Sequence, residues 1–147
     1  MNYRKGSVLA LSSLLLGLGA AGLSLAVAGD EDSKLHKAME VVQAKNGFIM
    51  KNTKTAAVFK KNQKDIVEAT KTLTKIGKEF REDDVETKDK KKDKKAWTDL
   101  MDAFVSETEK FAVAAGKDDA KQPDVKKAYA NVSGTCTKCH DLFRPEE

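Results

Sequence analysis

Apolar residues recur at intervals of three and four along the chain from about residue 33, which is the spacing of one face of an α-helix. Four segments carry this pattern, and none alternates apolar and polar residues for long. The first segment starts near Asp32-Ser33, and the second runs from about Thr55 to Phe80. The third runs from about Lys94 to Ala115, and the fourth follows Pro123. Four helices joined by short or polar connections predict an all-α fold, an antiparallel up-down-up-down four-helix bundle.

The residues at the ends of these segments suit helix termini. Ser33 is a good capping residue, Gly116 is placed to end the third helix, and Pro123 fits a first helical turn. Asn46 interrupts the apolar face of the first helix. The predicted buried faces are Leu35, Met39, Val42 and Ile49; Ile66, Ala69, Leu73, Ile76 and Phe80; Trp97, Leu100, Met101, Phe104, Thr108 and Phe111; and Val125, Ala128, Tyr129 and Val132.

The connection at residues 81–95 reads REDDVETKDKKKDKK, with Val85 as its one aliphatic residue. Such a composition predicts a solvated, mobile loop. No internal repeat and no second domain is apparent, so residues 29–147 are expected to form a single domain.

The N-terminal residues have the pattern of a secretory signal peptide. Arg4 and Lys5 precede an apolar stretch at residues 8–25, and Ala26-Val27-Ala28 has the small-x-small form of a cleavage site. Residues 1–28 are therefore expected to be a signal peptide cleaved after Ala28. The alternative is an uncleaved membrane anchor, since the apolar stretch approaches spanning length.

Length and charge exclude several classes of protein. A chain of 147 residues is too short for a barrel enzyme or a doubly wound nucleotide-binding fold, and two cysteines exclude a disulfide-rich scaffold. The signal peptide takes two basic residues and no acidic one from totals of 27 and 23. The small remaining charge does not favour nucleic-acid binding. What remains is a polar domain with a thin core, which would gain stability from a bound apolar cofactor.

The fourth segment ends in Cys136-Thr137-Lys138-Cys139-His140, the C-x-x-C-H pattern of c-type haem attachment. Residues three apart on a helix lie on the same side, so both thiols can add across the two vinyl groups of one porphyrin. His140 follows at once and is expected to be the proximal iron ligand. The sequence thus predicts one covalently attached haem c per chain. Haem attachment of this kind occurs outside the bacterial cytoplasm, so the export signal supports it.

Three other interpretations explain the motif less well. A C-x-x-C redox dithiol normally opens a helix in a βαβ setting, which is not predicted here. A structural zinc ion needs four ligands, and His36 would have to join Cys136, Cys139 and His140. A structural disulfide leaves His140 unexplained.

The second axial ligand is left open by the motif, because haem proteins use Met, use a second His or leave the position free. Met39 is the favoured candidate, since it lies on the predicted buried face and its thioether is a soft ligand. The alternatives are core packing by Met39 with an open iron, and ligation by His36, which is better interpreted as a surface residue. Met50 and Met101 are better interpreted as packing residues.

The ending from Cys136 to Arg144 closely resembles that of the cytochrome c′ family, the class II cytochromes c. The resemblance covers about residues 31–144, and Trp97 followed by Asp99 also resembles the family. It implies a four-helix bundle with the haem near the C-terminus. It also implies that Arg144, one turn after the histidine, helps to set the electrostatic surroundings of His140.

The first helix also resembles that family. The residue facing the open side of the haem lies about eight positions before a glycine, which here gives Met39 and Gly47. Members with a small apolar residue there are five-coordinate and bind NO or CO, whereas members with Met are low-spin electron carriers. One departure is Leu35, where an arginine commonly meets a haem propionate, and Lys34 or Lys37 would have to substitute. The long lysine-rich loop is a second departure.

The sequence therefore predicts an exported, periplasmic monohaem electron carrier that is not an enzyme, with a five-coordinate NO- or CO-binding protein as the alternative. Redox partner proteins are expected, and Lys60-Lys61 or residues 90–95 would meet acidic ones. Nucleic-acid binding and membrane insertion after cleavage are not expected. The resemblance implies dimers through the first two helices, but no large apolar patch is evident, so a homodimer is left open.

Overall fold

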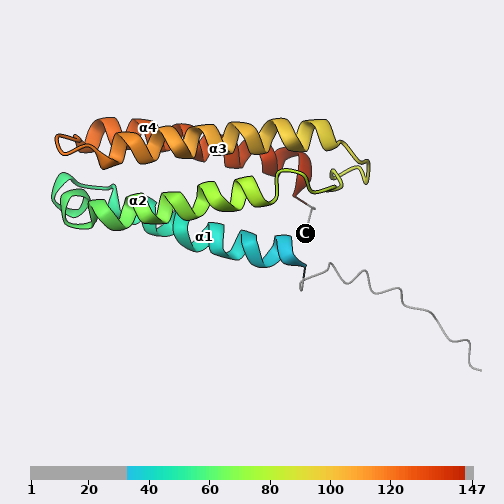
Figure 1. Cartoon of the computed structure of the whole chain (residues 1–147), viewed down its shortest axis with the longest axis horizontal. Coiled ribbons are helices and arrows are strands. Elements are labelled where there is room, and N and C mark those ends of the chain that lie inside the picture. The colour runs from blue at the N-terminus through green and yellow to red at the C-terminus, as the bar shows by residue number, and fades with distance from the viewer. Residues whose placement is uncertain (1–32, 145–147) are drawn as a thin grey trace, which may run out of the picture.

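The computed structural model describes residues 33–144. Its helices are α1 (Lys34–Asn52), α2 (Ala56–Glu79), α3 (Lys94–Gly116) and α4 (Gln122–Phe143). Consecutive helices run in opposite directions side by side, which confirms the predicted all-α four-helix bundle (Figure 1). The predicted signal peptide at residues 1–28 lies outside the described residues.

Three helices begin where a side chain caps them. The side chains of Ser33, Thr55 and Asp93 accept hydrogen bonds from the backbone N–H groups of His36, Val58 and Ala96. These oxygens satisfy donors that have no partner inside the helix. Helix α4 has no side-chain cap but carries proline in its first turn, as predicted.

The helices pack as neighbours in chain order. Helix α2 packs against both α1 and α3, and α3 also packs against α4. Among the described residues, direct backbone approach between α1 and α4 is slight. Helix α1 begins, α4 ends and the α2–α3 connection turns at one end of the bundle (Figure 1).

A buried cluster built around three aromatic residues, Phe80, Trp97 and Phe143, lies at this end of the bundle. The Trp97 indole N–H donates to the Phe80 carbonyl at 2.7 Å, and its ring meets that of Phe143 edge to face with centroids 5.2 Å apart. We call this the aromatic cluster, and its buried members are Ala38, Ile76, Phe80, Trp97, Met101 and Phe143. A second buried cluster fills the rest of the bundle and includes Ile49, Phe59, Ile66, Leu73, Phe111, Val125, Tyr129 and Val132.

On the interior face of α1, the predicted residues Leu35, Met39 and Val42 are partly buried, and the unpredicted Ala38 is buried. Ala38 is buried in the aromatic cluster with Leu35 and Val42 packed against it, whereas Met39 is only partly buried. The spacing of Leu35, Ala38 and Val42 is also helical, and the smaller residue takes the central place. Asn46, which interrupts this face, accepts a hydrogen bond from the Tyr129 hydroxyl of α4 at 2.5 Å.

The α2–α3 connection is largely exposed, as its composition predicts. It nevertheless has internal order, with an antiparallel bridge between Glu86 and Lys92. The predicted mobility of this loop stays a prediction. In the part of the chain that the structure describes, none of the helices combines the length and apolar character needed to cross a membrane.

Candidate functional site

The two cysteines of the C-x-x-C-H motif continue the interior face of α4. Tyr129, Val132, Cys136, Cys139 and Phe143 follow one another at intervals of four and three, and the first two and the last are buried. Both cysteines are partly buried, and Cys139 packs against the aromatic cluster. The thiols therefore lie on one side of the helix, toward the interior of the bundle.

Burial keeps both thiols protonated at neutral pH. It raises the pKa of Cys136, and it raises the pKa of Cys139 to about 11, with a smaller contribution from Cys136. Reactive dithiols have a lowered pKa, because the thiolate is the nucleophile. The two thiols are free rather than joined in a disulfide. This environment disfavours the redox-dithiol and disulfide interpretations.

His140 and Arg144 lie at the exposed end of the same helix. His140 is in the last turn of α4, directly after Cys139, and its carbonyl accepts the backbone N–H of Arg144 at 3.3 Å. Arg144 caps the helix, and both side chains are exposed in this structure. The axial role of His140 and the tuning role of Arg144 stay predictions.

Met39 lies on α1 at the same end of the bundle. The residues on either side of it in the helical pattern, Leu35, Ala38 and Val42, belong to or pack against the aromatic cluster that Cys139 also contacts. The fold thus brings the Met39 segment and the haem-attachment motif, which are far apart in the sequence, to one apolar cluster. Met39 itself is partly buried beside this cluster.

The other candidate ligands divide into surface and core residues. His36 is about half exposed, with its ring nitrogen 3.8 Å from the carboxylate of Glu40. Met101 is 5% exposed inside the aromatic cluster, as expected for a packing residue. The packing interpretation of Met50 is wrong, since its side chain is 54% exposed. The reason is that Ile49, one position earlier, takes the interior place on α1.

The zinc alternative finds no assembled ligand set. Within residues 33–144, no group of three or more His, Cys, Asp and Glu side chains is arranged to hold a metal ion. The set of Cys136, Cys139, His140 and His36 is therefore not brought together in the described structure.

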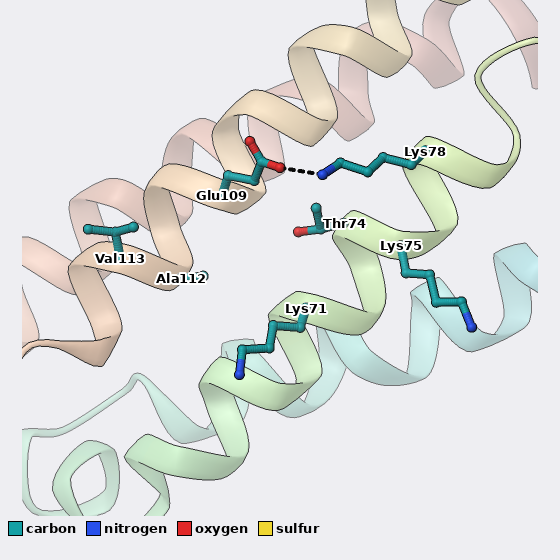
Figure 2. Close-up of a pocket in the computed structure, with 7 residues that line it drawn as sticks. All are labelled: Lys71, Thr74, Lys75, Lys78, Glu109, Ala112 and Val113. Carbon is teal, nitrogen blue, oxygen red and sulfur yellow. Dashed lines mark ion pairs between the residues drawn. The ribbon is translucent and has the colours of Figure 1, made fainter.

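A separate surface hollow lies between α2 and α3 and contains none of the predicted site residues. Lys78 of α2 reaches across it to Glu109 of α3, with a nitrogen–oxygen distance of 2.6 Å (Figure 2). Thr74, which also lines it, donates to the Thr108 hydroxyl at 2.9 Å. The lining residues are Lys71, Thr74, Lys75, Lys78, Glu109, Ala112 and Val113. The hollow is bounded by two helices that carry no part of the motif.

Sequence reasoning missed the contacts that support the motif from outside α4. The Trp97 ring buttresses Phe143, one turn after Cys139, and Val85 of the loop packs against the same cluster. Val85 was the one available signal, as the single aliphatic residue in a charged loop. The Tyr129–Asn46 hydrogen bond between α4 and α1 had no local signal at all.

The residues at this end of the bundle fit a covalently held porphyrin. Two protonated thiols face the interior from one side of α4, and an imidazole follows directly. The apolar cluster beside Cys139 suits the body of a macrocycle, which is itself apolar. Cys136 and Cys139 would hold such a group, and His140 would supply a nitrogen ligand to its iron.

Comparison with known proteins agrees with this donor set. No curated protein and no solved structure matches the chain significantly. The sequence profile of the family Cytochrome C′, whose members bind covalently attached haem c, matches residues 27–144, which is most of the chain. We conclude that the chain belongs to the cytochrome c′ family and is a haem c cytochrome.

Proposed function

We propose that this protein is an exported monohaem electron carrier. In this proposal Cys136 and Cys139 tether the haem, His140 is the proximal ligand and Met39 is the distal ligand. The observation that supports it best is the meeting of the Met39 segment of α1 with Cys139 of α4 at the aromatic cluster.

The haem supplies a ferric–ferrous couple that exchanges one electron at a time. The chain has to hold its own groups still while the charge on the iron changes. Two thioether links from one helix face would fix the haem on α4, and the Trp97–Phe143 contact holds the last turn of that helix. Burial of Ile76, Phe80 and Met101 beside Cys139 lowers the local polarity, which is one of the protein's means of setting a reduction potential. None of these tasks needs a general acid, a general base or a nucleophile.

Arg144 belongs to this proposal as a positioning and electrostatic residue. It ends α4 one turn after His140, and its guanidinium is a permanent positive charge at this end of the bundle. Such a charge stabilises the reduced iron relative to the oxidised iron, or it pairs with a haem propionate. In either role Arg144 raises the reduction potential, so an Arg144→Gln variant should have a lower potential than the native protein. Equal potentials in the two proteins would show that Arg144 does not act on the haem.

A second function, binding of NO or CO at an open iron, is favoured by one observation. Ala38, rather than Met39, is the α1 residue buried in the aromatic cluster. Met39 is partly buried outside this cluster, and if its thioether does not bind the iron, a diatomic ligand would take that position.

The visible spectrum of the matured protein separates the two functions. We expect low-spin spectra in both oxidation states that do not change when CO is added, because two strong ligands occupy the iron. Met39→Ala should produce a high-spin spectrum that shifts with CO. Met50→Ala is the matched control, since Met50 is exposed on the same helix, and its spectrum should equal that of the native protein. A CO shift in the native protein would show instead that the iron is open and that gas binding is the function.

Export to the periplasm is proposed from the N-terminal sequence and the family. We expect the protein from a bacterial periplasm to begin at Gly29 and to carry one haem mass. Measurement of its intact mass checks both points. An intact mass that includes residues 1–28 would contradict cleavage and favour the anchored form.

A further inference from the structure

The α2–α3 loop is tied to the helix that carries the haem motif. The backbone N–H of Lys88 donates to the carbonyl of Leu142 at 2.8 Å, two residues after His140. Val85, earlier in the loop, packs against the aromatic cluster that Cys139 contacts. A polar and an apolar contact therefore hold this charged loop against the last turn of α4.

The middle of the loop, residues 87–91, is a compact turn that we call the lysine turn. The Thr87 N–H donates to the Lys91 carbonyl and the Lys90 N–H to the Thr87 carbonyl, both at 2.8 Å. The Lys91 N–H donates to the Thr87 hydroxyl at 3.2 Å. Lys90 has φ of 56°, a left-handed conformation that glycine or asparagine adopts more readily than lysine. Lysine therefore occupies a position whose backbone conformation favours glycine or asparagine.

The lysines of the loop region differ in whether a carboxylate pairs with them. Lys92 lies 2.7 Å from Asp84, and Lys94 lies 3.5 Å from Glu82. Lys95 likewise pairs with Asp99 within its own helix. Within residues 90–95, Lys92, Lys94 and Lys95 therefore have a neighbouring acid that compensates part of their charge.

The lysine turn carries the lysines of this loop that are not paired with a carboxylate of the described chain. Lys88, Lys90 and Lys91 are exposed, and among residues 33–144 no carboxylate forms an ion pair with any of them. Asp89 lies between them in the turn, so the turn keeps a net positive charge. The other lysine pair noted in the sequence, Lys60-Lys61, lies near the start of α2, at the opposite end of the bundle (Figure 1).

We propose that Lys88, Lys90 and Lys91 form the docking surface for an acidic protein that exchanges electrons with this cytochrome. The inference rests on the proposed function and names the partner's chemistry. Unpaired lysines attract and orient an acidic surface, which raises the rate of encounter. Because the turn is hydrogen-bonded to the last turn of α4, the partner is brought to the end of the molecule that carries the haem motif.

The rate at which a small anionic reagent oxidises the protein tests the electrostatic field of the lysine turn. Hexacyanoferrate(III) takes one electron from the ferrous protein, which becomes ferric, and is itself reduced to hexacyanoferrate(II). At low ionic strength we expect Lys88→Gln/Lys90→Gln/Lys91→Gln to lower this rate several-fold. The matched control Lys54→Gln/Lys61→Gln/Lys64→Gln removes the same charge near the start of α2 and should lower it less than half as much. The difference in rate between the lysine-turn variant and the native protein should vanish in high salt. With the cationic oxidant tris(phenanthroline)cobalt(III), the variant should instead react faster than the native protein.

Competition separates an acidic protein from a membrane as the partner. Polyglutamate, a soluble chain of protein carboxylates, should slow the reaction of the native protein with hexacyanoferrate(III) and leave that of the lysine-turn variant unchanged. Vesicles containing phosphatidylglycerol should bind the native and variant proteins equally weakly. Vesicle binding that requires the three lysines would overturn the proposal in favour of a membrane surface. Equal rate losses in the variant and the control would also overturn it, because net charge alone would then explain them.

Two checks keep this test separate from the proposed function. Each variant should retain the native visible spectrum, and Lys88→Gln/Lys91→Gln, which leaves the backbone at Lys90 untouched, should show most of the rate loss. If the visible spectrum shows an open iron in the native protein, the proposed electron-carrier function is wrong. The oxidation rates of the lysine-turn variant and its control would still show whether the turn attracts anionic reagents.

Discussion

At the scale of single residues, burial decides the chemistry of the groups along the inner face of α4. Tyr129 is buried, and its hydroxyl donates to the side-chain oxygen of Asn46 at 2.5 Å. Burial, with a smaller contribution from Cys136, raises the pKa of Tyr129 to about 12. The same cause raises the pKa of both cysteines further along the helix. The inner face of α4 therefore favours neutral groups, as an apolar cofactor requires.

The raised pKa of Tyr129 predicts a loss of stability at alkaline pH. An unfolded tyrosine loses its proton near pH 10, whereas folded Tyr129 keeps it to about pH 12. The contribution to stability is thus complete below pH 10 and decreases as the pH rises from 10 to about 12. In the mature protein expected from cleavage after Ala28, Tyr129 is the one tyrosine, so tyrosinate absorbance reports this residue alone. A midpoint near pH 10 in the folded protein would contradict the burial of this hydroxyl.

At the scale of elements, a single glycine allows two of the helices, α2 and α3, to pack closely. A Cβ atom on Gly77 of α2 would lie 2.8 Å from Val105 Cγ2 and 2.9 Å from Phe104 Cδ1 of α3. Such approaches are shorter than van der Waals contact, so the absence of a side chain at Gly77 allows α2 and α3 to pack closely. The α2–α3 loop contacts the end of α4 by other means, which are the backbone hydrogen bond from Lys88 to Leu142 and the packing of Val85 against the aromatic cluster.

Two glycine substitutions test this contact. Gly77→Ala should lower the free energy of unfolding by about 1–3 kcal/mol, because the added methyl group overpacks the α2–α3 interface. Gly47→Ala is the matched control, since a Cβ there meets no atom within 4 Å. It should raise the free energy of unfolding by about 0.5–1 kcal/mol through helix propensity. Chemical denaturation of both variants measures the difference, and equal changes in the two would exclude overpacking.

At the scale of the whole molecule, the C-x-x-C-H motif and the aromatic cluster lie at one end of the bundle. Helices α1 and α4 approach each other only slightly through their backbones, yet both contribute to the aromatic cluster. A haem bound by Cys136 and Cys139 would add apolar contacts at this place, and a ligand that binds the folded state stabilises it.

We expect a protein without the two haem-attaching cysteines to be less stable. Cys136→Ser/Cys139→Ser should yield protein without covalent haem, and its melting temperature should fall by several degrees or more. A loss of only about 1 kcal/mol shifts the melting temperature of a domain of about this size by roughly 4 °C. Thermal melts followed by circular dichroism give the shift, and a pyridine haemochrome assay gives the haem content. Retention of covalent haem in this variant would show that other residues attach it.

The sequence by itself determined the features that depend on local spacing. The apolar period of three to four predicts the bounds of α2 and α3 to within one residue at each end. The capping residue Ser33 marks the start of α1, and Pro123 marks the first turn of α4, because both act on the adjacent turn. The C-x-x-C-H spacing places two thiols on one side of a helix wherever that helix lies in space.

Only the tertiary structure decided the features that depend on distances between helices. It placed Ala38 rather than Met39 in the aromatic cluster, and it left Met50 exposed. It also paired Asn46 with Tyr129 and tied Lys88 to α4. The physical reason is that a helical period fixes which residues share a face but leaves that face free to rotate by part of a turn. Packing against the neighbouring helices sets the rotation, and so selects which residues meet the site.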